Sequence, residues 1–231
     1  MNFRKFAFIT VVFGLICFAY FSYFVYNVML VSNTAFESKQ AFIYIKSNSK
    51  YDQVREDLLP LINDIKTFDI LAKQKKYINN VKAGRYIIEK NMTNNDIINT
   101  IRSKNIPITV SFNNQNSLEK LAKRISMQIE ADSLSLINAF RDSVFLNSNG
   151  FNKENILAMY LPNSYDFFWN TSAVKFRSKI QKEYNKFWNS KRIIKAKNLE
   201  YHPVEVSILA SIVQEESKEI TEPVKNCRSV Y

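Results

Sequence analysis

The longest uncharged segment of the chain lies near its N-terminus and limits what the chain can fold into. It runs from Phe6 to Tyr26 and is long enough to cross a bilayer, which takes about 20 residues. Two positive residues precede it, and the next positive residue is Lys39. Because positive residues favour the cytoplasmic side, we predict that residues 1–5 are cytoplasmic, that residues 6–28 form a transmembrane anchor and that the rest is exported.

A cleaved signal peptide is the alternative interpretation of this segment. Its apolar core would be longer than signal peptides usually carry, and the following VSNTAFES lacks a good pattern of small residues for cleavage. We therefore expect an uncleaved, single-pass anchor.

Charge and cysteine content exclude several classes of function. The formal net charge of +11 favours an anionic partner such as lipid headgroups, nucleic acid or an acidic polymer, and export argues against nucleic acid. Cys17 lies in the apolar segment and Cys227 near the C-terminus, so a disulfide between them is not expected. With His202 as the single histidine, the parts for most metal sites and for Ser-His or Cys-His catalysis are missing. We expect neither metal nor cofactor.

Beyond residue 40, short alternating segments and amphipathic segments follow one another. Thr93, Ser117 and Asp132 stand at positions typical of helix N-caps. The sequence thus predicts an α+β fold: a transmembrane helix, a small α+β module at 40–105, and a mainly helical domain. The expected strands are 41–49, 84–89 and 106–114, and the expected helices are 51–64, 93–103, 117–129, 132–142 and 171–188.

Aromatic residues make up 14% of the chain and allow two interpretations. Trp169, Trp188 and the tyrosines are expected mainly in hydrophobic cores. The alternative is that some of them line a groove in which the C–H faces of sugar rings stack.

The motif SIVQEES at 211–217 leads an apolar run into two adjacent acids. At about 100° per residue, Leu209, Ile212 and Val213 form the centre of an apolar helix stripe. Glu216 falls close to the middle of that stripe. An acid on such a face is desolvated, and desolvation favours its protonated form. A carboxylic acid kept protonated near neutral pH is what general acid catalysis at a glycosidic oxygen needs.

Two structural alternatives compete with this interpretation of Glu216: the helix has frayed there, or a lysine pairs with the carboxylate. Glu205 needs no functional explanation. It lies in the first turn after Pro203, where an acid complements the helix dipole and the free backbone donors.

Five segments resemble, in order, the endolytic murein transglycosylase family, also called YceG-like proteins. They are the N-terminal anchor, KAGRYIIEKNMTNNDIINTI, ITVSFNNQNSLEKLAKRI, YLPNSYDFFWNTSA and LASIVQEES. The last is similar to the family pattern A-S-I-[IV]-E-x-E-[ST], whose second acid is the catalytic glutamate and corresponds to Glu216. Gln214 replaces the first acid of that pattern.

The resemblance implies cleavage of the MurNAc–GlcNAc bond inside peptidoglycan strands without water, which leaves 1,6-anhydroMurNAc ends. It also implies that residues 40–105 form a LysM-like module, that residues 106–231 form the catalytic domain, and that no cofactor is needed. The expected location is the bacterial inner (plasma) membrane with most of the chain in the periplasm. The expected partners are glycan strands, the membrane and the cell wall synthesis machinery.

The C-terminus departs from the family, whose members continue through a segment like KIAGVYxNRL. A one-base shift in a possible coding sequence for KNCRSVY, residues 225–231, yields Lys-Ile-Ala-Gly-Val-Tyr. We therefore expect a truncated catalytic domain with an aberrant tail from about residue 225. The alternative function is an inactive, truncated form that acts only as a glycan-binding membrane anchor.

Overall fold

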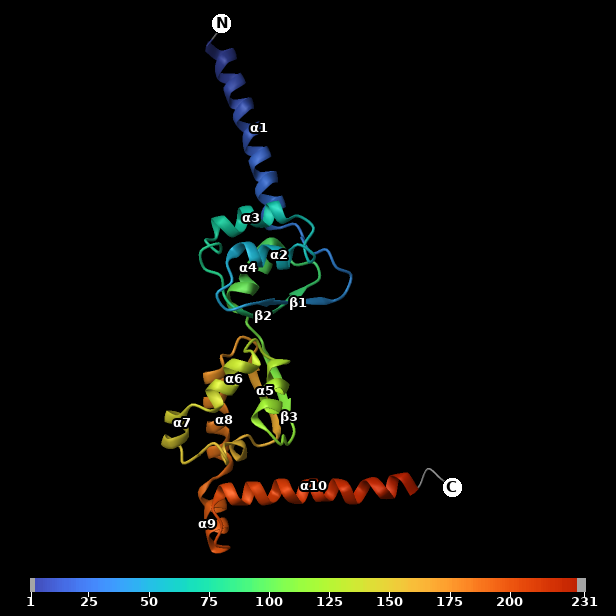
Figure 1. Ribbon diagram of the computed structural model, residues 1–231. Helices are drawn as coiled ribbons and strands as arrows, with labels where there is room; N and C mark the ends of the chain where they lie inside the picture. Colours follow the sequence, from blue (N-terminus) through green and yellow to red (C-terminus); the bar gives the residue numbers. More distant parts are fainter. Residues whose placement is uncertain (1–2, 228–231) are drawn as a thin grey trace. The chain divides into compact units, whose positions relative to one another are not determined.

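The computed structural model describes the backbone of residues 3–227 and the side chains of residues 8–214 and of Glu216 (Figure 1). The aberrant tail expected from about residue 225 lies outside these side chains, and residues 228–231 lie outside the described chain. Two compact units are present. The first comprises residues up to Pro107 together with Phe168–Asn170, and the second comprises Ile108–Phe167 together with the residues from Thr171 onward.

The chain begins with helix α1 (Phe3–Met29). Its portion Phe8–Met29 is long enough and apolar enough to span a membrane, and side chains along it are exposed, Phe13 by 67% and Phe18 by 69%. An N-terminal helix of membrane-spanning length is therefore confirmed.

The first unit continues through two strands and three helices, so a mixed α and β fold is confirmed. Strands β1 and β2 pair antiparallel, with Ile43 opposite Tyr86. Because side chains alternate along a strand, Ile43, Ile45, Tyr86 and Ile88 all point into the core and are buried. The elements are β1 (Gln40–Ile45), α2 (Tyr51–Leu58), α3 (Ile65–Gln74), β2 (Gly84–Glu89) and α4 (Asn94–Ser103).

The helix predicted over 51–64 is wrong in extent, and the helix that follows it was not predicted. Helix α2 ends at Leu58, two residues before Pro60, which has no backbone N–H to continue the helix. Asp64 then begins α3, because its side chain accepts hydrogen bonds from the backbone N–H groups of Lys66 at 2.8 Å and Thr67 at 3.3 Å.

A buried pair of asparagines connects α1 to the rest of the first unit. Asn33 and Asn94 are 5% and 1% exposed, and Asn33 Nδ2 donates to Asn94 Oδ1 at 2.6 Å. Asn94 Nδ2 donates to the carbonyl oxygen of Val28 at 3.0 Å. Asn33 Oδ1 accepts from the backbone N–H of Asp64 at 2.7 Å. The last turn of α1, the start of α3 and the start of α4 are therefore held together by satisfied buried hydrogen bonds.

The glycine of the KAGRY segment has a special conformation. Gly84 has φ +154°, and a Cβ placed on it would lie 2.5 Å from Asn105 Cγ. Asn105 Oδ1 accepts from the backbone N–H of Arg85 at 3.1 Å, and its Nδ2 donates to Asn170 Oδ1 at 3.2 Å. Asn170 Nδ2 in turn donates to the carbonyl oxygen of Ala83 at 3.2 Å. These bonds attach Phe168–Asn170 to the first unit.

The second unit is mainly helical, with one two-stranded sheet formed by β3 and β4. The N-caps predicted from sequence are confirmed in both units: Ser117 accepts from Lys120 N at 3.2 Å and Asp132 from Ser135 N at 2.7 Å, as Thr93 does in α4. The elements are β3 (Pro107–Phe112), α5 (Leu118–Ser126), α6 (Ser133–Phe140), α7 (Ser143–Ser148), η1 (Ile156–Met159), β4 (Asn163–Phe168), α8 (Ala173–Phe187), α9 (Ser190–Asn198) and α10 (Pro203–Cys227).

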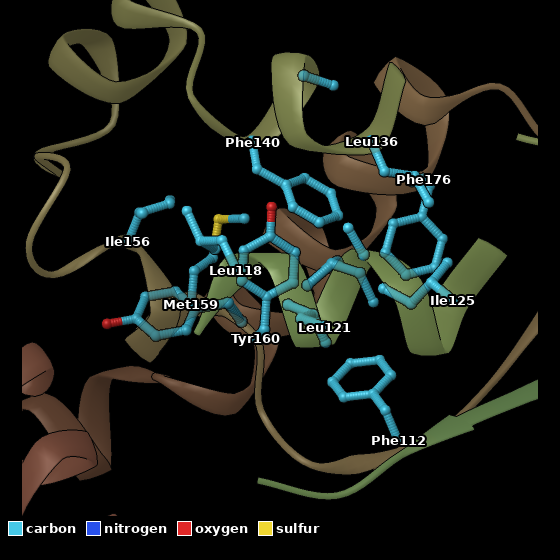
Figure 2. Close-up of a cluster of buried hydrophobic side chains, with 14 of the residues drawn as sticks. Phe112, Leu118, Leu121, Ile125, Leu136, Phe140, Ile156, Met159, Tyr160 and Phe176 are labelled. Atoms are coloured by element: carbon cyan, nitrogen blue, oxygen red, sulfur yellow. The ribbon is translucent and has the colours of Figure 1, made fainter. Parts of the chain in front are cut away.

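Aromatic rings fill the core of the second unit (Figure 2). The ring of Phe140 lies 4.7 Å from that of Tyr160 and 6.3 Å from that of Phe176, measured between centroids. Leu121 and Ile125 of α5 are buried in the same cluster. Ile156 and Met159 of η1 are buried in this core, which holds η1 in place.

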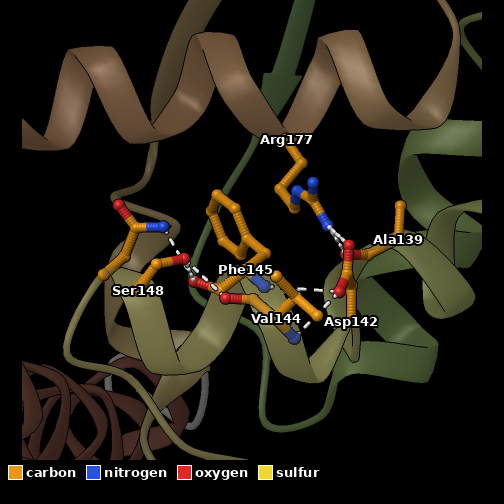
Figure 3. A network of polar contacts seen from close by, with 7 residues as sticks. Ala139, Asp142, Val144, Phe145, Ser148 and Arg177 are labelled. Carbon is orange, nitrogen blue, oxygen red and sulfur yellow. Dashed lines mark hydrogen bonds and ion pairs between the residues drawn. The ribbon is translucent and has the colours of Figure 1, made fainter.

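A buried arginine connects α8 to α6 and α7 (Figure 3). Arg177 is 6% exposed, and its Nη1 donates to the carbonyl oxygen of Ala139 at 2.6 Å and to Asp142 Oδ2 at 3.0 Å. Its guanidinium carbon lies 3.8 Å from the centroid of the Phe145 ring. The Arg177 guanidinium, followed by the backbone N–H of Phe145, lowers the pKa of Asp142.

Candidate functional site

Helix α10 carries the acidic motif, and its beginning follows the prediction. Pro203 is its first residue. The backbone N–H of His202 donates to Glu205 Oε2 at 2.6 Å. Glu205 therefore satisfies a free backbone donor at the helix start, and the structural account of this acid is confirmed.

The apolar stripe of α10 does not face the core. Leu209, Ile212 and Val213 are 43%, 52% and 63% exposed, and Glu216 is exposed as well. The burial predicted for Glu216 is therefore wrong for the described structure. The reason is that α10 packs on η1 and α9 through another face, on which Val204 is buried.

The structure also tests the two structural alternatives for Glu216, a frayed helix and a lysine partner. Helix α10 continues to Cys227, so the helix does not end before Glu216. Among the described side chains, no lysine lies within ion-pair distance of the Glu216 carboxylate. Glu216 is thus an exposed helical carboxylate.

Glu216 lines an open cavity of about 520 Å³ between α10 and the loop that follows β3. The loop contributes the amides of Asn114, Gln115 and Asn116, α5 contributes Lys120, and α10 contributes Ser211 and Ile212. Amides and hydroxyls both donate and accept hydrogen bonds, as sugar hydroxyls do. The cavity therefore offers one carboxylate beside a row of polar groups.

The loop at 113–116, which we call the amide loop, is attached to α10 by a side-chain contact. Asn114 Nδ2 donates to Gln214 Oε1, two residues before Glu216. In the resemblance described above, Gln214 replaces the first acid of the family pattern. Its amide bonds to the loop, so it serves as a structural contact here.

Two further cavities adjoin the amide loop and α10. One of about 250 Å³ is lined by Asn113, Glu154 and Tyr160 among others. The other, of about 380 Å³, is largely apolar and includes Leu199 and Trp188 in its lining. Ser207 and Ser211 of α10 line both. A groove lined by both polar and apolar groups, with a largely apolar cavity beside it, thus follows the first half of α10.

Trp188 lines the apolar cavity beside this groove. It is 8% exposed and belongs to the core of the second unit, so core packing, the expected interpretation, is confirmed for it. Trp169 packs in the first unit, where its ring lies 5.1 Å from that of Tyr44.

Sequence reasoning missed the amide loop and Glu154. The run NNQN at 113–116, which overlaps the end of the strand predicted over 106–114, was the available signal, because consecutive Asn and Gln residues supply both donors and acceptors. Glu154 has no comparable signal, because it reaches the groove only through the fold of the second unit.

Comparison with known proteins gives the family. No curated protein matches the chain. A crystal structure of a protein from Listeria monocytogenes described as YceG-like is similar at 18% sequence identity and a TM-score of 0.40, and the match covers 71% of this chain and 60% of that chain. The model of the YceG-like family matches residues 43–225. The chain therefore belongs to the YceG-like family.

Proposed function

We propose that this protein is a membrane-anchored endolytic lytic transglycosylase that cleaves the MurNAc–GlcNAc bond within peptidoglycan strands. Family membership over residues 43–225 carries the proposal. The position of Glu216 on a cavity lined by three amide side chains and the hydroxyl of Ser211 supports it.

In the proposed reaction Glu216 acts first as an acid and then as a base. Its carboxyl proton goes to the bridging oxygen while the bond from C1 of MurNAc to that oxygen breaks. The carboxylate left behind takes the proton of the MurNAc 6-hydroxyl as O6 bonds to C1. Glu216 thus donates one proton and takes one proton back, and no water is consumed. One carboxylate suffices because the nucleophile is already held on the substrate.

The exposure of Glu216 places a requirement on this mechanism. An acid open to water lacks the desolvation that favours its protonated form. The bound glycan strand would have to supply that desolvation by covering the cavity between α10 and the amide loop. The amide of Asn114 and the hydroxyl of Ser211 line the same cavity and would orient the sugar by hydrogen bonds.

The activity is tested by incubating the detergent-solubilised chain with purified peptidoglycan and analysing the products by mass spectrometry. Anhydro ends are lighter than hydrolysed ends by one water. We expect Glu216→Gln to lower their formation at least about 100-fold, the lower end for loss of a general acid. Glu215→Gln, a change of the same charge at the adjacent position, is the matched control and should retain activity. Equal product from wild type and Glu216→Gln would refute the role of Glu216.

A second candidate function is favoured by the exposure of Glu216. In it the chain binds glycan without cleaving it, and residues 40–105 act as a LysM-like, glycan-binding module held at the membrane by α1. Binding to peptidoglycan without anhydro products from any preparation of this chain would support it over the enzyme.

We further propose that α1 crosses the inner membrane once, with residues 1–5 in the cytoplasm and both units in the periplasm. Its length and apolar composition support a membrane span, and the two basic residues before the apolar segment support the orientation. Protease added to spheroplasts should digest the two units, and protection of both from digestion would contradict this orientation.

A further inference from the structure

The outer surface of the two-stranded sheet in the first unit carries exposed aromatic side chains. Phe42 lies opposite Ile87, and Tyr44 lies opposite Arg85. All four point away from the core, because their neighbours along each strand are the buried residues of the opposite face. Phe42 is 40% exposed and Tyr44 43% exposed. We call these four residues, together with Trp169, the aromatic sheet face.

Trp169 joins this face from a distant part of the sequence. Its ring meets that of Tyr44 edge-on, with 5.1 Å between centroids and 69° between planes. The next residue, Asn170, bonds to Asn105 and to the carbonyl oxygen of Ala83. The hydrogen bonds of Asn170 therefore fix the chain next to Trp169, and the ring of Trp169 contacts that of Tyr44 in β1.

Arg85 supplies the positive charge of the face. Its guanidinium carbon lies 4.2 Å from the centroid of the Phe42 ring and 6.0 Å from that of Tyr44. Among the described residues the guanidinium makes one weak hydrogen bond, from Nη1 to the carbonyl oxygen of Pro107 at 3.5 Å, and its Nε is buried without a partner. The buried Nε is out of a ligand's reach, but the N–H groups of Nη2 make no hydrogen bond to the described residues and stay available for a carboxylate, with which arginine forms paired hydrogen bonds.

A purely structural account covers part of this arrangement. Aromatic residues favour strands, and the stacked arginine shields Phe42. It does not explain why Tyr44 stays 43% exposed beside a tryptophan that is fixed next to it. Exposed apolar patches bounded by polar groups mark binding surfaces.

We propose that the aromatic sheet face binds a carbohydrate chain that carries carboxylates. Sugar rings would stack on Tyr44 and Trp169, and Arg85 would pair with a carboxylate of the chain. The choice of peptidoglycan as this carbohydrate rests on the proposed function, in which glycan strands are the ligand. The face would hold a strand independently of Glu216.

The test is co-sedimentation of the full chain, in detergent, with purified insoluble peptidoglycan. Tyr44→Thr keeps a residue that favours strands and removes the ring, and we expect Kd to rise about three- to tenfold, the range for one aromatic contact. Combining it with Trp169→Ala should abolish measurable sedimentation. Arg85→Gln should weaken binding at low salt more than at high salt. Tyr201→Thr removes an equally exposed tyrosine (46%) from the second unit and should bind like wild type.

Circular dichroism checks that each variant is folded, and Phe42→Thr replaces any variant that is not. Wild-type binding by the folded Tyr44→Thr, Trp169→Ala double variant would overturn the inference. The inference would also be overturned if the double variant lost binding to vesicles of anionic phospholipid while it kept binding to peptidoglycan. The face would then contact membrane. If the chain forms anhydro products but its binding does not depend on this face, this inference alone is contradicted. If the chain binds through the face but forms no anhydro products, only the proposed enzymatic activity is contradicted.

Discussion

Replacement of Gly84 by alanine tests how the first unit is held together. The new Cβ would lie 2.5 Å from Asn105 Cγ and 2.6 Å from both Asn105 Nδ2 and Oδ1. Atoms do not approach so closely, so the Asn105 side chain would have to move. Its bonds to the backbone N–H of Arg85 and to Asn170 would be lost with it.

The expected loss of stability has two parts. Alanine at φ +154° is strained by roughly 1–3 kcal/mol, as for other residues held in regions that only glycine populates. Two hydrogen bonds contribute about 1 kcal/mol each. Gly84→Ala should therefore lower the free energy of unfolding of the first unit by about 3–5 kcal/mol, a large share of the total stability of an ordinary domain.

The two tryptophans provide separate reporters for the two units. Trp169 packs in the first unit and Trp188 in the second. In a Trp188→Phe background, fluorescence during urea unfolding follows Trp169 alone, and Gly84→Ala should shift its transition to lower urea concentration. In a Trp169→Phe background, the Trp188 transition should stay unchanged.

Gly150→Ala is the matched control, because Gly150 also has positive φ, +72°, but has nothing within 4 Å of an added Cβ. It carries backbone strain without a clash, so its effect, read from Trp188, should be about 1–2 kcal/mol. An effect of Gly84→Ala no larger than that of Gly150→Ala would refute the steric reasoning. Asn105→Gly added to Gly84→Ala should recover little, because it removes the clash but also the hydrogen bonds.

Three further predictions concern hydrogen-bonded side chains. Asn94→Ala should destabilise the first unit by about 2–4 kcal/mol in urea unfolding, because the buried Asn33 amide and the Val28 carbonyl oxygen lose a partner; an effect below about 0.5 kcal/mol would contradict the buried bonds. The lowered pKa of Asp142 makes its contribution to stability present above the ordinary value of 3.8 and lost as the pH falls through the folded value. Asp142→Asn should therefore flatten the acid limb of thermal stability, and an unchanged limb would speak against the pairing with Arg177. Glu205→Ala should cost about 1 kcal/mol in thermal unfolding followed by Trp188, because the N–H of His202 loses its acceptor; Glu200→Ala, outside the helix, is its control.

The sequence predicted those features that depend on neighbouring residues. Thr93, Ser117 and Asp132 cap helices as expected, because a cap is a contact between residues two or three positions apart. The strand predicted over 84–89 has the observed limits. Its alternation of buried and exposed residues is likewise a local pattern.

Features set by tertiary contacts were predicted less well. Strand β4 (Asn163–Phe168) was not predicted, because its pairing with β3 joins segments about 50 residues apart. Trp169 packs in the first unit, where its neighbour Asn170 bonds to Asn105. No periodic sequence pattern connects Asn170 with Asn105. Helical periodicity placed Glu216 on an apolar stripe correctly but could not show that nothing among the described residues covers that stripe.

The buried asparagine pair has a consequence for how far the protein can reach. Val28, inside α1, is 3% exposed and accepts a hydrogen bond from Asn94, and the backbone of Asn33 bonds to that of Met92 at 2.9 Å. There is thus no slack tether between the end of α1 and the fold that follows it. With α1 in a bilayer, the first unit would lie directly at the membrane surface. Its own size would then set how far from the membrane it extends. Under the proposed function, the glycan strands that the first unit meets would be those nearest the membrane.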